Sequence, residues 1–146
     1  MLMGAVVNMR PDLFKAVIAD VPFVDVLNTM LEVPFPSRRW NITSGAIPRT
    51  ASSILTSSRI HHMTTSIAGI PAYVWVSGGI SDPRVTYWEP TKWTAQLRES
   101  KTDENLLLLK IHMDSGHAGA SGRFDRLKEV ALEYAFILKV FAAGQG

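Results

Sequence analysis

Two polar residues stand where a sheet of parallel strands would place catalytic groups, just beyond the carboxyl ends of the strands. Asp82 follows the apolar stretch YVWVSGG, and His117 lies in the loop after NLLLLKIHMD. A histidine can take the proton of a serine hydroxyl, and an aspartate can hold the imidazole in the required tautomer and stabilise its cation. Together with a serine nucleophile, the pair would form a hydrolytic triad.

Each of these residues also has a plainer interpretation. An aspartate after a strand is common in turns, and a histidine in a glycine-rich loop is commonly a solvated surface residue. The loop SGHAGASGR could instead present backbone N–H groups to a phosphate. It lacks the Gly-Lys-Ser/Thr ending of a P-loop. The residue pattern alone leaves these interpretations open.

A second constellation is the adjacent pair His61 and His62 in RIHHMTT. Adjacent histidines suggest a metal site, but no carboxylate or further histidine stands at ligand spacing nearby. We therefore expect no metal here, and we predict chemistry without a cofactor.

The elements that would position Asp82 and His117 follow from apolar patterning. Apolar runs of strand length predict strands at 15–23, 71–79 and 105–113. Further patterning predicts helices at 2–14, 24–32, 91–100 and 124–144, with Thr91 as a candidate N-cap. In the last helix, the apolar residues at helical spacing are Leu127, Val130, Ala131, Tyr134, Ile137, Leu138 and Phe141. Strands that alternate with helices predict an α/β fold with a mostly parallel sheet.

The composition fits a single domain or a piece of one. The chain has 146 residues, of which 47% are hydrophobic, and a net charge of +2. No block of Lys and Arg follows one face, so we expect no nucleic-acid partner. The absence of cysteine excludes disulfides. No apolar run reaches the roughly 20 residues that span a bilayer, and the N-terminus lacks a secretory signal, so we expect a cytoplasmic protein.

Three stretches are long and specific enough to compare with known families. They are LMGAVVNMRPDLFKAVIADVPFVDVLNTML, VSGGISDPRVTYWEPTKW and LRESKTDENLLLLKIHMDSGHAGASGRFDRLKEVALEYAFILKV. They resemble the prolyl oligopeptidase family of serine peptidases. The resemblance covers the chain outside 33–70 and implies the C-terminal half of an α/β-hydrolase catalytic domain. In the family a β-propeller caps this domain and admits only short peptides. The branch that these stretches resemble cleaves after Arg and Lys, which implies short basic peptides as substrates.

Matched motif by motif, the resemblance gives roles to three residues. Asp82 in SDPRV corresponds to the triad aspartate, and His117 in SGHAG corresponds to the triad histidine. Arg84 corresponds to an arginine that holds the backbone of the substrate.

The resemblance also implies that the nucleophile lies outside this chain. The family motif reads G-x-S-A-G-G-L-L-M-G-A and the sequence begins MLMGA, so the serine would precede Met1. The nucleophile elbow, the first strands of the sheet and the propeller would also precede Met1. Without a serine the Asp–His pair has nothing to activate, and we expect the chain alone to be inactive. Its expected partner is the missing N-terminal part of the same enzyme. A non-catalytic binding or assembly module and one half of a split enzyme are the alternatives.

The stretch 33–70 breaks both the patterning and the resemblance. Where the family carries YSPYDN, the chain has RIHHMTT. Written with the codons CGT ATT CAC CAT ATG ACA AC and read from the last base of the Arg59 codon, RIHHMTT becomes YSPYDN. Residues 44–48, SGAIP, become EWGDP in the same phase. We therefore predict that 33–70 is translated out of frame, between two compensating errors, and lacks a defined fold. A diverged insertion is the alternative.

The shifted stretch would also affect substrate choice. In the family, acidic residues of this region help to form the pocket for the basic side chain of the substrate, where a carboxylate can bind Arg through paired hydrogen bonds. This chain has Arg38, Arg39 and Trp40 there instead. We therefore expect altered specificity even if a serine is supplied.

Overall fold

The computed structural model of the protein describes residues 2–25, 28–29, 72–120 and 122–142. The stretch 33–70, with His61 and His62, lies outside these residues. Most of the helix predicted at 24–32 lies outside them as well, although 28–29 are helical. No helix in the described part of the chain is long and apolar enough to cross a membrane.

In the described residues the sheet has three strands, and the sequence predicted each of them. They are β1 (Ala16–Asp20), β2 (Tyr73–Gly79) and β3 (Leu107–His112), all parallel and in the order β1-β2-β3. Their apolar runs suit parallel strands, because helices cover both faces of such a sheet. The α/β prediction with a parallel sheet flanked by helices is therefore confirmed.

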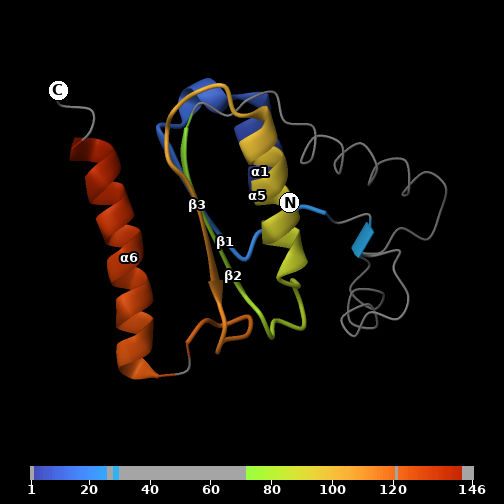
Figure 1. The fold of residues 1–146 in the computed structure, drawn as a ribbon, viewed down its shortest axis with the longest axis vertical. Coiled ribbons are helices and arrows are strands. Elements are labelled where there is room, and N and C mark those ends of the chain that lie inside the picture. Colours follow the sequence, from blue (N-terminus) through green and yellow to red (C-terminus); the bar gives the residue numbers. More distant parts are fainter. Residues whose placement is uncertain (1, 26–27, 30–71, 121, 143–146) are drawn as a thin grey trace.

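Helices lie on both faces of this sheet (Figure 1). On one face are α1 (Leu2–Met9) and α5 (Trp88–Ser100), and on the other is α6 (Arg123–Ala142). A short 3-10 helix, η1 (Pro11–Leu13), follows α1. Pro11 ends α1 because its ring removes a hydrogen-bond donor and clashes with the preceding turn.

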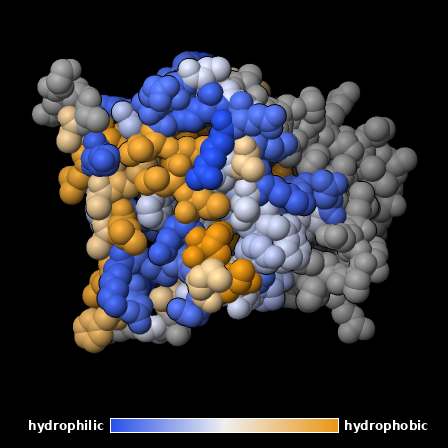
Figure 2. Space-filling view, in the orientation of Figure 1, coloured by the Kyte–Doolittle hydropathy of each residue, from blue (hydrophilic) through white to orange (hydrophobic). Residues whose placement is uncertain are grey.

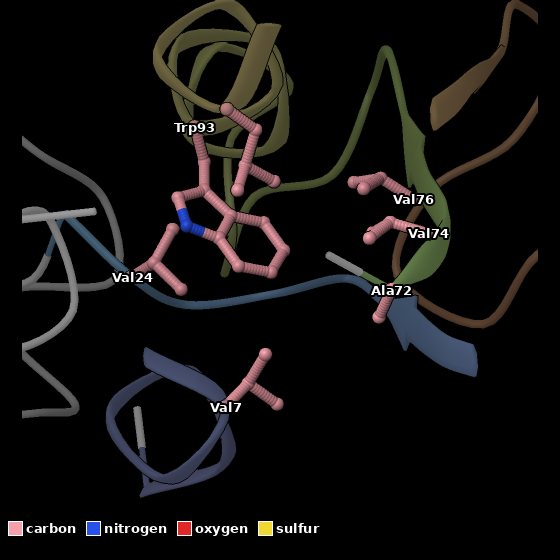
Figure 3. Packing of buried hydrophobic residues seen from close by; sticks show 7 residues of the cluster. Val7, Val24, Ala72, Val74, Val76 and Trp93 are labelled. Atoms are coloured by element: carbon pink, nitrogen blue, oxygen red, sulfur yellow. The ribbon is translucent and has the colours of Figure 1, made fainter. Parts of the chain in front are cut away.

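The main core lies between the sheet and the pair α1 and α5 (Figure 3). Val7 of α1 and Trp93 of α5 meet Val74 and Val76 of β2, and each of these side chains is at most 3% exposed. Leu97, one turn beyond Trp93, is 1% exposed and belongs to the same cluster. This core fixes β2, the central strand, from which Asp82 follows.

On the other face α6 contacts the sheet through a different side from the one that its apolar pattern suggested. Phe136 and Val140 are buried, and the Phe136 ring lies 5.9 Å from the ring of Trp75 on β2. The predicted apolar face is instead largely exposed, with exposed fractions of 59% for Leu127, 62% for Tyr134, 68% for Leu138 and 57% for Phe141. Hydrophobic residues gather on this side of the molecule in Figure 2. The helix was predicted correctly, but the part of the chain that the structure describes leaves its apolar face largely exposed.

The start of α5 differs from the prediction. The helix begins at Trp88, and Tyr87 is its N-cap. Thr91 lies inside the first turn, where its hydroxyl donates to the Tyr87 carbonyl at 2.7 Å. The prediction that Thr91 is the N-cap was therefore wrong, because its hydroxyl satisfies a carbonyl within the helix rather than a free N–H.

Glu89 in the first turn of α5 fixes the chain that follows β1. One of its carboxylate oxygens accepts the backbone N–H groups of Val24 and Asp25, both at 2.8 Å, and the other accepts the Thr29 hydroxyl at 2.5 Å. The residue is completely buried. Burial raises the pKa of Glu89, although the three hydrogen bonds oppose that shift. A buried carboxylate with three donors joins two segments that are distant in the sequence.

The packing predicts different outcomes for two leucines in helices on opposite faces of the sheet (Figure 1). Leu97→Ala should lower the free energy of unfolding by about 2–5 kcal/mol, because it opens a cavity in a closed core. Leu138→Ala, the matched control on the exposed face of α6, should change it by no more than about 0.5 kcal/mol. Urea denaturation followed by circular dichroism measures both. Equal losses would contradict the described core.

Candidate active site

The ends of β2 and β3 lie side by side, which brings together two loops that are distant in the sequence. Gly79 and His112 pair at the end of the register, and the N–H of Ile80 donates to the His112 carbonyl at 3.0 Å. A Cβ on Gly79 would lie 2.5 Å from the Ser115 carbonyl oxygen. Only glycine leaves room for the second loop to cross here. The close crossing places the loop after β3 against the turn after β2.

Asp82 lies in that turn with its carboxylate fully buried. The side chain has no exposed surface. Its Oδ1 accepts the backbone N–H of Arg84 at 2.7 Å and that of Val85 at 3.0 Å. A buried carboxylate costs several kcal/mol unless donors surround it. These two hydrogen bonds satisfy one oxygen and leave Oδ2 to face the neighbouring loop.

His117 lies in the neighbouring loop, with its Nδ1 at 2.8 Å from Asp82 Oδ2. The loop turns back through a hydrogen bond from the Gly119 N–H to the Gly116 carbonyl at 3.2 Å. The ring is 38% exposed, whereas its partner is fully buried. An ionised carboxylate only accepts hydrogen bonds, so Nδ1 carries the proton and the neutral ring keeps Nε2 as an acceptor. This is the orientation that a histidine needs to act as a general base.

Arg84 lies beside Asp82 and contacts it through the backbone rather than the side chain. Its N–H is one of the two donors to Asp82 Oδ1, and the residue itself is exposed. The structure thus brings the three predicted site residues together at the carboxyl end of the sheet.

A polar cavity of about 250 Å³ extends from His117 toward α6. The sequence pattern did not reveal the other polar residues that line it, because they come from four separate elements, β1, β2, β3 and α6. Asp20 at the end of β1 accepts the Ser77 hydroxyl of β2 at 2.6 Å. Glu133 of α6 faces the same space, and burial, followed by the charge of Asp20, raises its pKa.

Val21 also lines this cavity and has an unusual backbone. Its φ of 48° falls in the left-handed region, which a β-branched residue rarely adopts. Such strain commonly occurs beside functional sites, at a cost of about 1–3 kcal/mol. Its N–H donates to the Ser77 carbonyl at 3.0 Å, which holds the bend at the end of β1.

The phosphate-binding interpretation of the His117 loop gains no support from the geometry. The Ala120 N–H, which a bound phosphate would need, donates to the Glu129 carboxylate at 3.1 Å. A carboxylate at this place would repel a phosphate.

A parallel sheet covered by helices on both faces, with an Asp–His pair beyond its strand ends, defines part of an α/β-hydrolase domain. Comparison with known proteins narrows the class. The profile of the prolyl oligopeptidase family matches residues 1–144, and the chain belongs to this family.

The similar proteins are much longer than this chain. Protease 2 of Moraxella lacunata is 43% identical over 138 residues, which cover 94% of this chain and 20% of the relative. The structure of oligopeptidase B from Leishmania major matches with a TM-score of 0.79 at 42% identity, covering 95% of this chain and 19% of that one. Mouse alpha/beta hydrolase domain-containing protein 10 shares the fold alone, with a TM-score of 0.63 at 17% identity over 95% of this chain and 58% of its own. The chain thus spans about a fifth of the length of the relative and of the oligopeptidase B that it matches.

Replacing the aspartate should reverse the tautomer of His117. In Asp82→Asn the side-chain amide donates to Nδ1, so the proton of the neutral ring should move to Nε2. Long-range ¹H–¹⁵N correlation spectra at a pH where the ring is neutral distinguish the two tautomers. The exposed Asp12, paired with Arg10, gives the control Asp12→Asn, which should leave His117 unchanged. The same tautomer in the parent chain and in Asp82→Asn would contradict the described pair.

Proposed function

We propose that this chain supplies the histidine and aspartate of a serine peptidase, and that the intact protein hydrolyses peptide bonds by acyl transfer. The observation that carries the proposal is the Asp82–His117 hydrogen bond of 2.8 Å, with one partner buried and the other open to a cavity. Membership of the prolyl oligopeptidase family supports the same chemistry.

In this mechanism Nε2 of His117 takes the proton of the serine hydroxyl as the oxygen attacks the peptide carbonyl. Asp82 stabilises the imidazolium that forms, and the proton then passes to the leaving amine. Water attacks the acyl-enzyme in the second step, with His117 again acting as the base. Two backbone N–H groups hold Asp82 in place, so the carboxylate needs no rearrangement during the reaction.

In the proposed mechanism the nucleophile is the serine of the family motif G-x-S-A-G-G, which in the family leads into the sequence LMGA found here at 2–5. Arg84 is assigned to the backbone of the substrate. Its exposed side chain, next to the buried aspartate, leaves the guanidinium free to reach a carbonyl group.

The proposed substrates of the intact protein are short peptides cut after Arg or Lys. The resemblance to the basic-specific branch of the family supports this choice. The residues that would capture the basic side chain fall within 33–70, where this chain has Arg38, Arg39 and Trp40 in place of the family's acidic residues. A corrected reading frame would encode the family's acidic residues in this stretch. The proposed specificity for Arg and Lys therefore depends on that correction.

The exposed face of α6 favours a role within a larger catalytic domain over a free-standing binding module. Four of its large apolar side chains, Leu127, Tyr134, Leu138 and Phe141, are each more than half exposed. In the described residues, β1 pairs only with β2 and leaves its other edge open. A further layer of polypeptide would cover the apolar surface and pair the open edge.

The proposal is tested by expressing the locus together with the sequence upstream of Met1 and measuring hydrolysis of Arg- and Lys-peptide esters. A fluorophosphonate probe should label a serine upstream of Met1. Asp82→Asn should lower kcat about 10⁴-fold, whereas Asp12→Asn should not change it. The 146-residue chain alone should give no specific labelling. Specific labelling of the short chain, or a longer product with the serine motif that is folded but inert, would contradict the proposal.

A further inference from the structure

The loop that carries His117 is attached to α6 at two points, and neither attachment was evident from the sequence. Nη1 of Arg126 donates to the Ala118 carbonyl at 3.1 Å. One turn further along the helix, Oε1 of Glu129 accepts the Ala120 N–H, also at 3.1 Å. These residues follow His117 directly, so the first turns of α6 fix the segment that leaves the catalytic ring.

Glu129 is the stronger of the two attachments because it bridges two elements. The same Oε1 lies 3.0 Å from Nδ1 of His112, the last residue of β3. Both side chains are largely buried, with His112 19% and Glu129 15% exposed. The carboxylate therefore joins the end of the strand before the loop to the backbone after the catalytic histidine.

The loop is also shaped to receive this carboxylate. Gly119 adopts a φ of 74°, and a Cβ at this position would lie 2.7 Å from Glu129 Oε2. A side chain would meet both an unfavourable backbone conformation and the carboxylate itself. The close approach shows that Glu129 packs directly against the turn that sets the position of His117.

We propose that Glu129 is a positioning residue for His117, and that it acts by holding residues 119–120 against the end of β3. Without this carboxylate, the segment after His117 would keep the contact of the exposed Arg126 and the turn from Gly116 to Gly119, but lose its bridge to the end of β3. The His117 ring would then spend less time in hydrogen bond with Asp82. The positioning role of Glu129 does not depend on the proposed function. Only the catalytic consequence of that role rests on the proposed function.

Titratable and charged groups from several elements face Glu129. His112 lies on β3, and Asp20 of β1 and Glu133 of α6 line the same cavity. Arg126 supplies a positive charge from the preceding turn of α6. Loss of the Glu129 charge therefore leaves His112 without its carboxylate partner, in addition to freeing Ala120. Glu133 provides a matched control, since it faces the same cavity from the same helix.

The test compares Glu129→Ala, Glu129→Gln and the control Glu133→Gln in the 146-residue chain by NMR. We expect amide hydrogen exchange of Ala120 to rise about three- to tenfold in Glu129→Ala, as loss of one hydrogen bond implies. The fraction of His117 with its proton on Nδ1 should fall. Glu129→Gln keeps an acceptor oxygen for Ala120 and should recover part of both effects. Glu133→Gln should leave both signals as in the parent chain.

Amide exchange of Val85, which bonds to Asp82, reports whether a variant keeps the rest of the site intact. Unchanged Ala120 exchange and an unchanged His117 tautomer in Glu129→Ala would overturn the proposal. If Glu129→Ala does not fold, Glu129→Met decides, because it keeps the length of the side chain but removes the acceptor oxygen: Ala120 exchange identical to that of the parent chain would overturn the proposal. None of these signals requires the nucleophile, so failure of the peptidase assay and failure of this proposal are separate results.

Discussion

The parallel register of β2 and β3 is the constraint on which the candidate site depends. It brings Gly79 beside His112, and the two following loops must then cross closely. Glycine at position 79 leaves room for the second loop to approach. The buried carboxylate of Asp82 then determines how that loop is oriented. A carboxylate without exposed surface needs donors on every side. Backbone N–H groups supply two, and His117 supplies the third. The need to satisfy this charge therefore orients the histidine.

The helix α6 has two roles on two different sides. Its side toward the sheet packs through Phe136 and Val140. Glu129 holds the His117 loop beyond the carboxyl ends of the strands. Away from the sheet it presents a stripe of apolar residues that nothing in the described chain covers. An exposed stripe of this kind marks a surface of interaction. The helix thus joins the His117 loop on one side to an exposed apolar surface on the other.

Much of this arrangement could be predicted from the sequence, because local patterning determines it. Apolar runs gave the three strands, and their alternation with helices gave the parallel sheet. The long motifs around Asp82 and His117 gave the family. The start of α5 was misplaced because Thr91 bonds to a carbonyl within the helix, which no sequence pattern distinguishes from capping.

The residues that sequence reasoning missed share one physical property. Asp20, His112, Glu129 and Glu133 acquire their surroundings only when three strands and α6 meet. The separation of Glu129 from His117 in the sequence does not predict a contact between the helix and the loop. Only the fold shows that the Glu129 carboxylate reaches Ala120. In the same way, helical periodicity identified the apolar face of α6 but could not say which partner covers it.

The first experiment is to resequence the genomic DNA across this locus, including the region upstream of Met1. We expect an upstream reading frame that encodes G-x-S-A-G-G directly before LMGA, with base errors near residues 33 and 70 whose correction restores YSPYDN. An upstream region without a nucleophile motif in any frame would contradict this expectation. The Asp82–His117 pair would then have no serine to activate.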